Sequence, residues 1–276
     1  MMPSAPLTLV NGAVQDTLPG LDRGLQYGDG VFRTVRVHRG RPQWWATHMC
    51  KLAEDAARLA IPAPPSAVWE REVDTLLATA PAECVLKLIL TRGTGPRGYR
   101  PAAQPEPTRI VQVSDWPANI EAVAARGAVV HLCALRLAEQ PRLAGIKHLN
   151  RLENVLATLE WPPGEADEGL MLDPSGRVVC GVSSNVFLVR QGRLLTPRLS
   201  RCGVAGVARQ QVLALAAQLK LPASESDIGL DELLTADEVF LTNSLIRLWP
   251  VARLGERHWG EPRLAAELRR LLDDAA

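Results

Sequence analysis

The chain contains 276 residues, of which 47% are hydrophobic and 22% are charged, and its formal net charge is +1. A charge near zero gives no electrostatic reason to expect binding to nucleic acid or to an acidic membrane surface. No stretch approaches the ~20 apolar residues of a membrane span, and the N-terminal sequence lacks a basic region followed by an apolar run. We therefore expect a cytoplasmic protein without a leader and without membrane contact.

The cysteines give no sign of a cross-linked or metal-bound scaffold. The chain has five of them, widely spread and without a Cys-x-x-Cys pair. An odd, scattered set argues against a disulfide framework and against a structural zinc site. We predict no metal site.

The first predicted elements are strands joined by turns. Asn11-Gly12, a strong type I′ turn signal, separates apolar runs at residues 7–10 and 13–14 and predicts a hairpin. A glycine-rich loop over residues 22–30 leads into an alternating strand, residues 31–38, and a return strand follows up to Trp45. We expect the valine face of the 31–38 strand to lie in the core. The opposite face carries Phe32, Thr34, Arg36 and His38.

Two helices and two further strands complete the predicted N-terminal half. The helices cover residues 47–60, with Thr47 as N-cap, and residues 66–79. Residues 84–90 are almost continuously apolar and predict a buried strand. The glycine- and arginine-rich stretch that follows, residues 91–100, is by composition a solvated surface loop. A strand at residues 108–113 ends this half.

The sequence divides into two predicted domains. A smaller N-terminal α/β domain covers residues 1–113, and the polar, proline-containing stretch 114–119 is the best candidate for a linker. The larger C-terminal domain covers residues 120–276.

The C-terminal half contains more predicted strands and one distinctive helix start. We predict a strand at residues 128–135, a hairpin over residues 169–180 and a strand at residues 186–189. The glycine-flanked turn at residues 203–206 opens a helix. Free N–H groups and the helix dipole favour an anion at such a position, although many glycine-led helices bind nothing. A strand over residues 247–254 and a helix over residues 263–272 end the chain.

Lys147 is the candidate for covalent chemistry. Leucine and valine recur at three- and four-residue steps after it and predict an amphipathic helix that begins just beyond the lysine. A helix N-terminus and neighbouring cations disfavour the ammonium form and favour the neutral, nucleophilic amine. Only four of the 31 lysine and arginine residues are lysines, and arginine cannot form an imine. A solvated lysine at a helix start is the alternative interpretation.

The lysine segment also carries a family resemblance. The run Gly-Ile-Lys-His-Leu-Asn-Arg-Leu-Glu at residues 145–153 resembles the lysine segment of the class IV aminotransferase family, the fold type IV pyridoxal-phosphate (PLP) enzymes. Its second part is more similar to the aminodeoxychorismate lyase branch of that family than to the transaminases. The resemblance implies a mixed α/β (α+β) fold like that of D-amino-acid aminotransferase, with the active site between two domains. It also implies that Lys147 holds PLP as an imine.

Other segments match the family in the same order along the chain. Tyr-Gly-Asp-Gly-Val-Phe at residues 27–32 and the Arg-Gly loop at residues 92–100 resemble segments that line the substrate pocket, and arginine suits a substrate with two carboxylates. The implied substrate-binding residues are Tyr27, Arg36, Arg92, Arg97, Tyr99 and Arg100. The implied cofactor-binding residues, besides Lys147, are Lys51, Cys180, Asn185, Val207, Ala208, Asn243 and Ser244.

Two of these positions depart from the family pattern. Cys180 stands where the family has a glutamate that contacts the PLP ring nitrogen, and a neutral thiol is a weaker partner for that nitrogen. Lys51 stands where an arginine usually holds the phosphate. A lysine supplies charge without the two-pronged geometry, and a solvated helix lysine is the alternative.

Together the resemblance implies a PLP-dependent lyase that converts 4-amino-4-deoxychorismate to 4-aminobenzoate and pyruvate, a step toward folate. Lys147 would act as imine lysine and general base. The alternatives are a D-amino-acid or branched-chain transaminase of the same fold, or a catalytically impaired PLP-binding homologue. By family analogy we expect a homodimer and a small-molecule substrate as the only other partner.

Overall fold

The computed structural model describes residues 7–274 and divides the chain into two compact units. Unit 1 comprises Met1–Pro117 and Lys147–Asn150, and unit 2 comprises Ala118–Ile146 and Arg151–Ala276. The predicted division placed the lysine in the C-terminal domain. The segment Lys147–Asn150 groups with unit 1 because it pairs with a strand of that unit. The N-terminal hexapeptide, on which the expectation of no leader depends, lies outside the described residues.

Unit 1 contains an antiparallel six-stranded sheet with the order β2-β1-β6-β5-β3-β4. The predicted opening hairpin is confirmed, and Asn11 and Gly12 both have the positive φ that its turn requires. The strands are β1 (Leu7–Val10), β2 (Ala13–Val14), β3 (Gly30–His38), β4 (Arg41–Pro42), β5 (Cys84–Thr91) and β6 (Thr108–Asp115).

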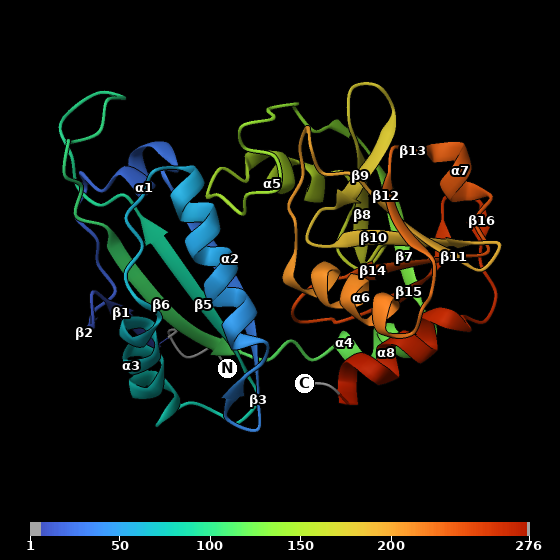
Figure 1. Cartoon of the computed structure of the whole chain (residues 1–276), viewed down its shortest axis with the longest axis horizontal. Coiled ribbons are helices and arrows are strands. Elements are labelled where there is room, and N and C mark those ends of the chain that lie inside the picture. The colour runs from blue at the N-terminus through green and yellow to red at the C-terminus, as the bar shows by residue number, and fades with distance from the viewer. Residues whose placement is uncertain (1–6, 275–276) are drawn as a thin grey trace. The chain divides into compact units, whose positions relative to one another are not determined.

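Helix α2 packs against β3 in unit 1 (Figure 1). The valine face of β3 is buried, as predicted. The helices of this unit are α1 (Arg23–Tyr27), α2 (Trp45–Arg58) and α3 (Ser66–Leu77). Two predictions are wrong. Helix α1 lies in the predicted loop, because Asp22 accepts a hydrogen bond from the Gly24 amide and caps it. Helix α2 begins before Thr47, so Trp44 is its N-cap and no return strand extends to Trp45.

Unit 2 is built on a ten-stranded sheet in which β12-β11-β10-β14-β15-β7-β8-β9-β13 are neighbours and β16 pairs with β15. The predicted hairpin forms β8 and β9. The strands are β7 (Ala128–Arg136), β8 (Glu168–Leu172), β9 (Arg177–Gly181), β10 (Asn185–Arg190), β11 (Arg193–Pro197), β12 (Ala223–Ser226), β13 (Ile228–Gly229), β14 (Glu238–Thr242), β15 (Trp249–Leu254) and β16 (Arg257–His258).

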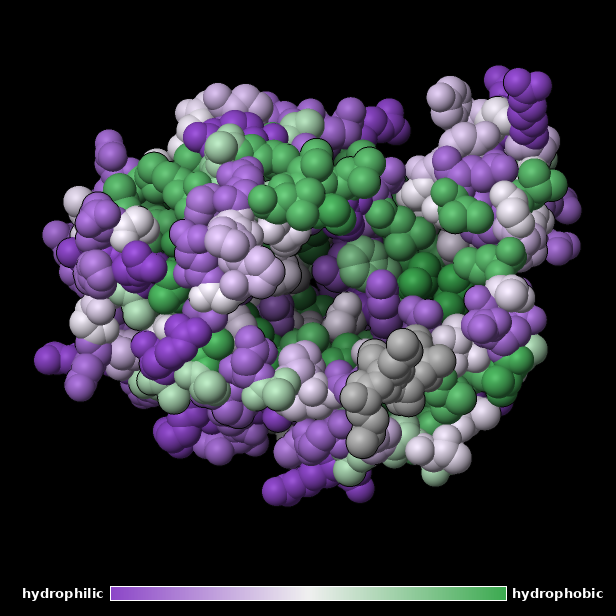
Figure 2. All heavy atoms as spheres, turned by 180° about the vertical axis from the view of Figure 1, so that it is seen from behind, coloured by the Kyte–Doolittle hydropathy of each residue, from purple (hydrophilic) through white to green (hydrophobic). Residues whose placement is uncertain are grey.

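The helices of unit 2 are α4 (Ile120–Arg126), α5 (Leu152–Thr158), α6 (Val207–Gln218), α7 (Leu230–Leu234) and α8 (Leu264–Asp274). The prediction of a helix starting directly after Lys147 is wrong, because α5 begins five residues later. Its apolar side chains are also not core: Leu152, Val155 and Leu156 are exposed. Figure 2 shows that hydrophobic side chains gather in patches on the face it presents. Among the described residues, no helix has the length and apolar character needed to cross a membrane.

Candidate active site

Lys147 lies on an extended segment at the edge of the unit 1 sheet. The Phe32 amide donates to the Lys147 carbonyl at 3.0 Å, and the Leu149 amide donates to the Gly30 carbonyl at 3.0 Å. Val31 and His148 form the bridge between these two bonds. The helix-dipole argument for Lys147 therefore does not apply, since the lysine lies outside any helix and an isolated bridge pairs its neighbour His148 with Val31 of β3.

A buried carboxylate holds the backbone of the lysine. The Lys147 amide donates to Asp55 Oδ2 at 2.9 Å, and Arg33 Nη2 donates to the same oxygen at 2.5 Å. Asp55 and Arg33 are each only 1% exposed. The Lys147 Nζ atom lies 4.4 Å from the centroid of the Phe32 ring. The amine is thus placed over an aromatic face by a backbone that an ion pair fixes.

His48 lies beside this ion pair, on α2. It is 1% exposed, and neither of its ring nitrogens has a hydrogen-bond partner among the described residues. Burial, with Arg33 and Lys147 nearby, lowers the pKa of His48 to about 3. The imidazole is therefore neutral near pH 7.

The two cations of this region differ in their surroundings. Lys51, the predicted phosphate ligand, is half-buried on α2 with its Nζ 3.2 Å from the exposed carboxylate of Glu54. Arg33 is buried, and it was not among the predicted site residues. The sequence does mark Arg33 as unusual. Strict alternation places it on the valine face of β3, where burying a charged side chain is energetically costly.

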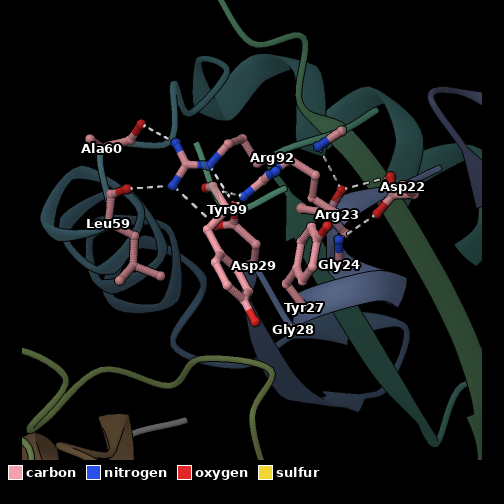
Figure 3. Close-up of polar contacts among 12 residues, drawn as sticks. Asp22, Arg23, Gly24, Tyr27, Gly28, Asp29, Leu59, Ala60, Arg92 and Tyr99 are labelled. Carbon is pink, nitrogen blue, oxygen red and sulfur yellow. Dashed lines mark hydrogen bonds and ion pairs between the residues drawn. The ribbon is translucent and has the colours of Figure 1, made fainter. Parts of the chain in front are cut away.

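Arg92 lies at the start of the predicted substrate loop, and its guanidinium contacts Asp29, Leu59 and Ala60 (Figure 3). Its guanidinium donates to both carboxylate oxygens of Asp29, at 2.7 and 3.0 Å, and to the carbonyls of Leu59 and Ala60, both at 2.7 Å. Burial raises the pKa of Asp29, but the hydrogen bonds from Arg92 and Arg23 outweigh it and hold that pKa below its usual value. These four bonds commit Arg92 to linking the turn after α1 to the residues that directly follow α2.

Arg23 and Tyr27 hold the other end of the same loop. Arg23 donates to the carbonyls of Gly98 and Tyr99 at 2.9 and 2.8 Å, and the Gly98 amide donates to the Tyr27 hydroxyl at 3.3 Å. The rings of Tyr27 and Tyr99 are 5.5 Å apart, while Tyr99 is 86% exposed. The backbone of the loop is thus held at Gly98 and Tyr99, while the Tyr99 side chain is exposed.

The remaining predicted substrate residues lie on two elements of unit 1: Arg97 and Arg100 on the loop after β5, and Arg36 on β3. Arg97 and Arg100 are exposed on the loop. Arg36 is half-buried, and its guanidinium carbon lies 4.7 Å from the centroid of the Trp116 ring. Cation–π contact of this kind holds the Arg36 side chain in one place along β3.

In unit 2 the predicted glycine turn is confirmed as the start of α6. The Gly145 amide donates to the Gly203 carbonyl at 2.9 Å, and the Ala205 amide donates to the Gly145 carbonyl at 3.0 Å. The turn is therefore tied to the residue two positions before Lys147 in the chain. Asn185 fixes the next residues: it accepts from the Gly206 amide at 3.1 Å and donates to the Val204 carbonyl at 2.8 Å.

The first turn of α6 has the features of an anion site. Gly206 is the N-cap, and no side chain caps the helix. A Cβ at this position would lie 2.4 Å from Asn185 Oδ1, so any other residue would displace the Asn185 side chain. Thr242, the register partner of Asn185, is fully buried, and its hydroxyl has no partner among the described residues. Amides of Val207 and Ala208 follow the cap, and these groups suit phosphate oxygens.

The predicted residues Asn243 and Ser244 follow the end of β14. Asn243 Oδ1 accepts from the amides of Leu245 and Ile246, each at 2.9 Å, and its Nδ2 donates to the Ser183 carbonyl at 3.2 Å. The Asn243 side chain therefore shapes the turn after β14. Asn185 has a similar positioning role at the glycine turn, and Ser244 is half-buried.

Cys180 is a neutral thiol in an apolar cluster that includes Cys133 and Cys202. Burial, followed by the effect of neighbouring Cys202 and Glu168, raises the pKa of Cys180 to about 12. A Cβ at Gly203 would lie 4.0 Å from the Cys180 sulfur, so the thiol sits behind the glycine turn. Burial also raises the pKa of Glu168, which accepts hydrogen bonds from the Ser183 hydroxyl and from its amide.

A family model described as Amino-transferase class IV matches residues 30–254 of the chain, most of its length. The chain belongs to the class IV aminotransferase family. The predicted family resemblance and the predicted mixed α/β fold class are thereby confirmed.

Relatives within the class IV aminotransferase family divide into lyases and transaminases. The chain is 36% identical over 245 residues to aminodeoxychorismate lyase of Vibrio harveyi, covering 88% of this chain and 89% of that protein. The crystal structure of 4-amino-4-deoxychorismate lyase from Pseudomonas aeruginosa superimposes with a TM-score of 0.93 at 46% identity, covering 97% of this chain and 98% of that one. D-alanine aminotransferase of Listeria monocytogenes is 29% identical over 241 residues, covering 84% of this chain and 81% of that protein.

Proposed function

We propose that this protein is a PLP-dependent lyase that converts 4-amino-4-deoxychorismate to 4-aminobenzoate and pyruvate. The placement of Lys147 carries the proposal: its amine lies 4.4 Å from the Phe32 ring, on a backbone fixed by a buried carboxylate. The lyase relatives at 36% and 46% identity match across nearly the whole chain and favour this reaction over transamination.

Two groups of residues, each described within its own unit, suit different parts of PLP. Lys147 provides the amine for covalent attachment, and the uncapped first turn of α6, with Val207 and Ala208, provides amides for the phosphate. Thr242, the last residue of β14, adds a possible donor for the phosphate, because its buried hydroxyl has no partner among the described residues. When bound, the cofactor withdraws electrons from the amine-bearing carbon of the substrate.

Lys147 takes the proton from the amine-bearing carbon of the substrate. The carbon–oxygen bond to the enolpyruvyl group then breaks, and the ring becomes aromatic, which makes the step irreversible. Arg36, Arg97 and Arg100 are the proposed partners of the two substrate carboxylates, because guanidinium binds carboxylate in a two-pronged manner. Tyr27 and Tyr99 line the same loop. Arg92 is a positioning residue at the start of this loop, because four hydrogen bonds already engage its guanidinium.

The proposal is tested by adding 4-amino-4-deoxychorismate to the PLP-loaded protein and measuring 4-aminobenzoate and pyruvate. We expect both products in equal amounts, and Lys147→Ala should lower the rate by about 10³-fold or more because base and attachment point are lost together. Lys220→Arg, at an exposed lysine far along the chain, is the matched control. Failure of the wild type to form 4-aminobenzoate would refute the proposal.

The second candidate is a D-amino-acid or branched-chain transaminase, which the identity to D-alanine aminotransferase favours. Cys180 argues against it. A neutral thiol stabilises negative charge on the cofactor ring less than a carboxylate does, and transamination needs that charge held long enough for reprotonation. We expect Cys180→Glu to gain transaminase activity with a 2-oxo acid while lyase activity persists. No change in either activity would contradict this role for Cys180.

The family resemblance also supports a homodimer in the cytoplasm. Sedimentation or light scattering of the purified protein tests the assembly, with a mass near twice the 30.0 kDa chain as the expected result. A mass of one chain at micromolar concentration would overturn it.

A further inference from the structure

Lys87 is an exposed lysine in the middle of a largely buried strand, and the reaction described above does not use it. The structure describes every residue of β5, and Lys87 alone among them is exposed. Its Nζ atom lies 5.5 Å from the centroid of the Phe32 ring, the same ring that the Lys147 Nζ atom approaches at 4.4 Å. We propose that Lys87 binds a carboxylate of the substrate, the one on the enolpyruvyl group that leaves as pyruvate. This inference rests on the proposed function, because it concerns the same substrate.

The strand register places Lys87 on the same face of the unit 1 sheet as the Phe32 ring. Phe32 and Thr34 alternate along β3 with the buried valines, so they share the face opposite those valines. Thr34 pairs directly with Lys87 on β5, and directly paired residues point to the same side of a sheet. The contact of Lys87 with the Phe32 ring agrees with this register. The Lys147 amine lies over that ring too, so both nitrogens belong to one face.

Lys87 stands in a row of polar side chains across the sheet. Gln112 on β6 pairs with Lys87 from the other side, so Thr34, Lys87 and Gln112 are neighbours on three strands. None of these three side chains has a hydrogen-bond or ion-pair partner in the part of the chain that the structure describes. A hydroxyl, an ammonium and a carboxamide all offer donors, so the row suits an anion with more than one acceptor oxygen.

The charge of this face also favours an anion. The rows on either side of Lys87 are Phe32, Ile89 and Ile110, and Arg36, Val85 and Ser114. The three rows thus contain two cations, Lys87 and Arg36, and no carboxylate. An ammonium that is held on an aromatic ring without an acidic neighbour in its own or the adjacent rows can pair with a carboxylate of the substrate.

The chemistry of the substrate decides which carboxylate Lys87 binds. The enolpyruvyl group is joined through one oxygen to the ring carbon next to the amine-bearing carbon, whereas the ring carboxylate lies on the opposite side of the ring. Lys147 acts on the amine-bearing carbon, and the Nζ atoms of Lys147 and Lys87 both lie within 5.5 Å of the Phe32 centroid. The carboxylate of the enolpyruvyl group is therefore the one that fits Lys87. The proposed arginine partners are then left for the ring carboxylate.

A carboxylate contact of this kind has a kinetic signature. The carboxylate keeps its charge while the carbon–oxygen bond breaks, so the Lys87 ammonium binds the ground state and the transition state alike. Uniform binding of this sort lowers KM and leaves kcat almost unchanged.

Steady-state kinetics of the PLP-loaded protein test the assignment. Lys87→Gln should raise KM for 4-amino-4-deoxychorismate by roughly 5- to 30-fold, because a charged hydrogen bond partly screened by water is lost, while kcat stays within about twofold. Lys87→Arg keeps the charge and should return KM to within about threefold of the wild type. Lys220→Gln, which removes the same charge from an exposed lysine of unit 2, is the matched control and should not change KM. A fall in kcat at unchanged KM in Lys87→Gln overturns the proposal.

Labelling of individual lysines gives a second readout that does not depend on turnover. The protein is treated with trinitrobenzenesulfonate, an amine reagent, in the presence of pyruvate, of pyruvamide, which lacks the carboxylate, or of neither. Mass spectrometry then measures the label on each lysine. Pyruvate at saturation should slow the labelling of Lys87 several-fold, pyruvamide should not, and Lys220 should respond to neither. Equal labelling of Lys87 under all three conditions identifies a solvated surface lysine and overturns the proposal.

The two readouts separate this inference from the proposed function. Protection of Lys87 by pyruvate in a protein that forms no 4-aminobenzoate refutes the proposed reaction and supports the carboxylate site. Formation of 4-aminobenzoate by a protein in which pyruvate does not protect Lys87 supports the reaction and refutes the site.

Discussion

The surroundings of Lys147 in unit 1 and the turn before α6 in unit 2 are built from different chemistry. Around Lys147 a charged pair, Arg33 and Asp55, is buried beside a neutral histidine. At the start of α6 the groups are backbone amides, a buried hydroxyl and a thiol, all uncharged near pH 7.

Of the two regions, the surroundings of Lys147 contain a buried ion pair, Arg33 and Asp55, whereas the turn before α6 depends on uncharged groups. A buried ion pair is sensitive to the loss of either partner and to pH, because an uncompensated charge has no water to stabilise it. A turn of backbone amides depends instead on local geometry, chiefly on a glycine that a side chain would disrupt. Substitutions in the two regions should therefore fail in different ways.

The largest effect is expected from breaking the ion pair. Asp55→Ala leaves Arg33 without its carboxylate and the Lys147 amide without its acceptor, so the free energy of unfolding should fall by about 3–5 kcal/mol. Urea unfolding followed by fluorescence measures it. Glu54→Ala, one residue earlier and exposed, should cost less than about 1 kcal/mol. Equal losses in the two variants would show that the buried pair has no special role.

The next effect is a dependence on pH. Folding lowers the pKa of His48 from 6.5 to about 3. The contribution of neutral His48 to the free energy of unfolding is therefore fully present above pH 6.5 and is lost progressively as the pH falls from 6.5 toward 3. Between pH 7.5 and pH 5 this amounts to about 2 kcal/mol, because the unfolded chain binds the proton first. His48→Gln should remove most of this slope in cofactor-free protein, whereas exposed His258→Gln should retain it. An unchanged slope in His48→Gln would contradict the assignment.

The smallest effect tests the glycine turn. Gly206→Ala places a Cβ 2.4 Å from Asn185 Oδ1, which should displace the amide and cost about 1–2 kcal/mol with a roughly tenfold loss of PLP affinity. Gly229→Ala is the control: this glycine is the N-cap of α7 and meets nothing within 4 Å. Both variants carry the same N-cap penalty, so the difference isolates the contact with Asn185. Indistinguishable stability and affinity would mean that Asn185 does not organise the turn.

Local patterns predicted much of the fold because the interactions that fix it are local. Asn11-Gly12 specifies the opening hairpin, and alternating valines specify the buried face of β3. The glycine turn before α6 follows from the same kind of signal. The lysine itself was found through a run of neighbouring residues and a family resemblance.

The errors arise where distant residues decide the structure. The helix after Lys147 starts late because two distant parts of the chain bind the lysine backbone. These are Phe32 of β3 and Asp55, the latter 92 positions away from Lys147. Arg92 resembled a substrate ligand, but its partners Asp29 and Leu59 could not be identified from spacing. Arg33 was overlooked although its place among valines marked it as unusual.

The central claim is that Lys147 carries the cofactor, and reduction with borohydride tests it most directly. The PLP-loaded protein is reduced, digested and analysed by mass spectrometry. We expect the reduced cofactor on the peptide that contains Lys147. Label on Lys51, Lys87 or Lys220 instead, or on no lysine at all, would contradict it.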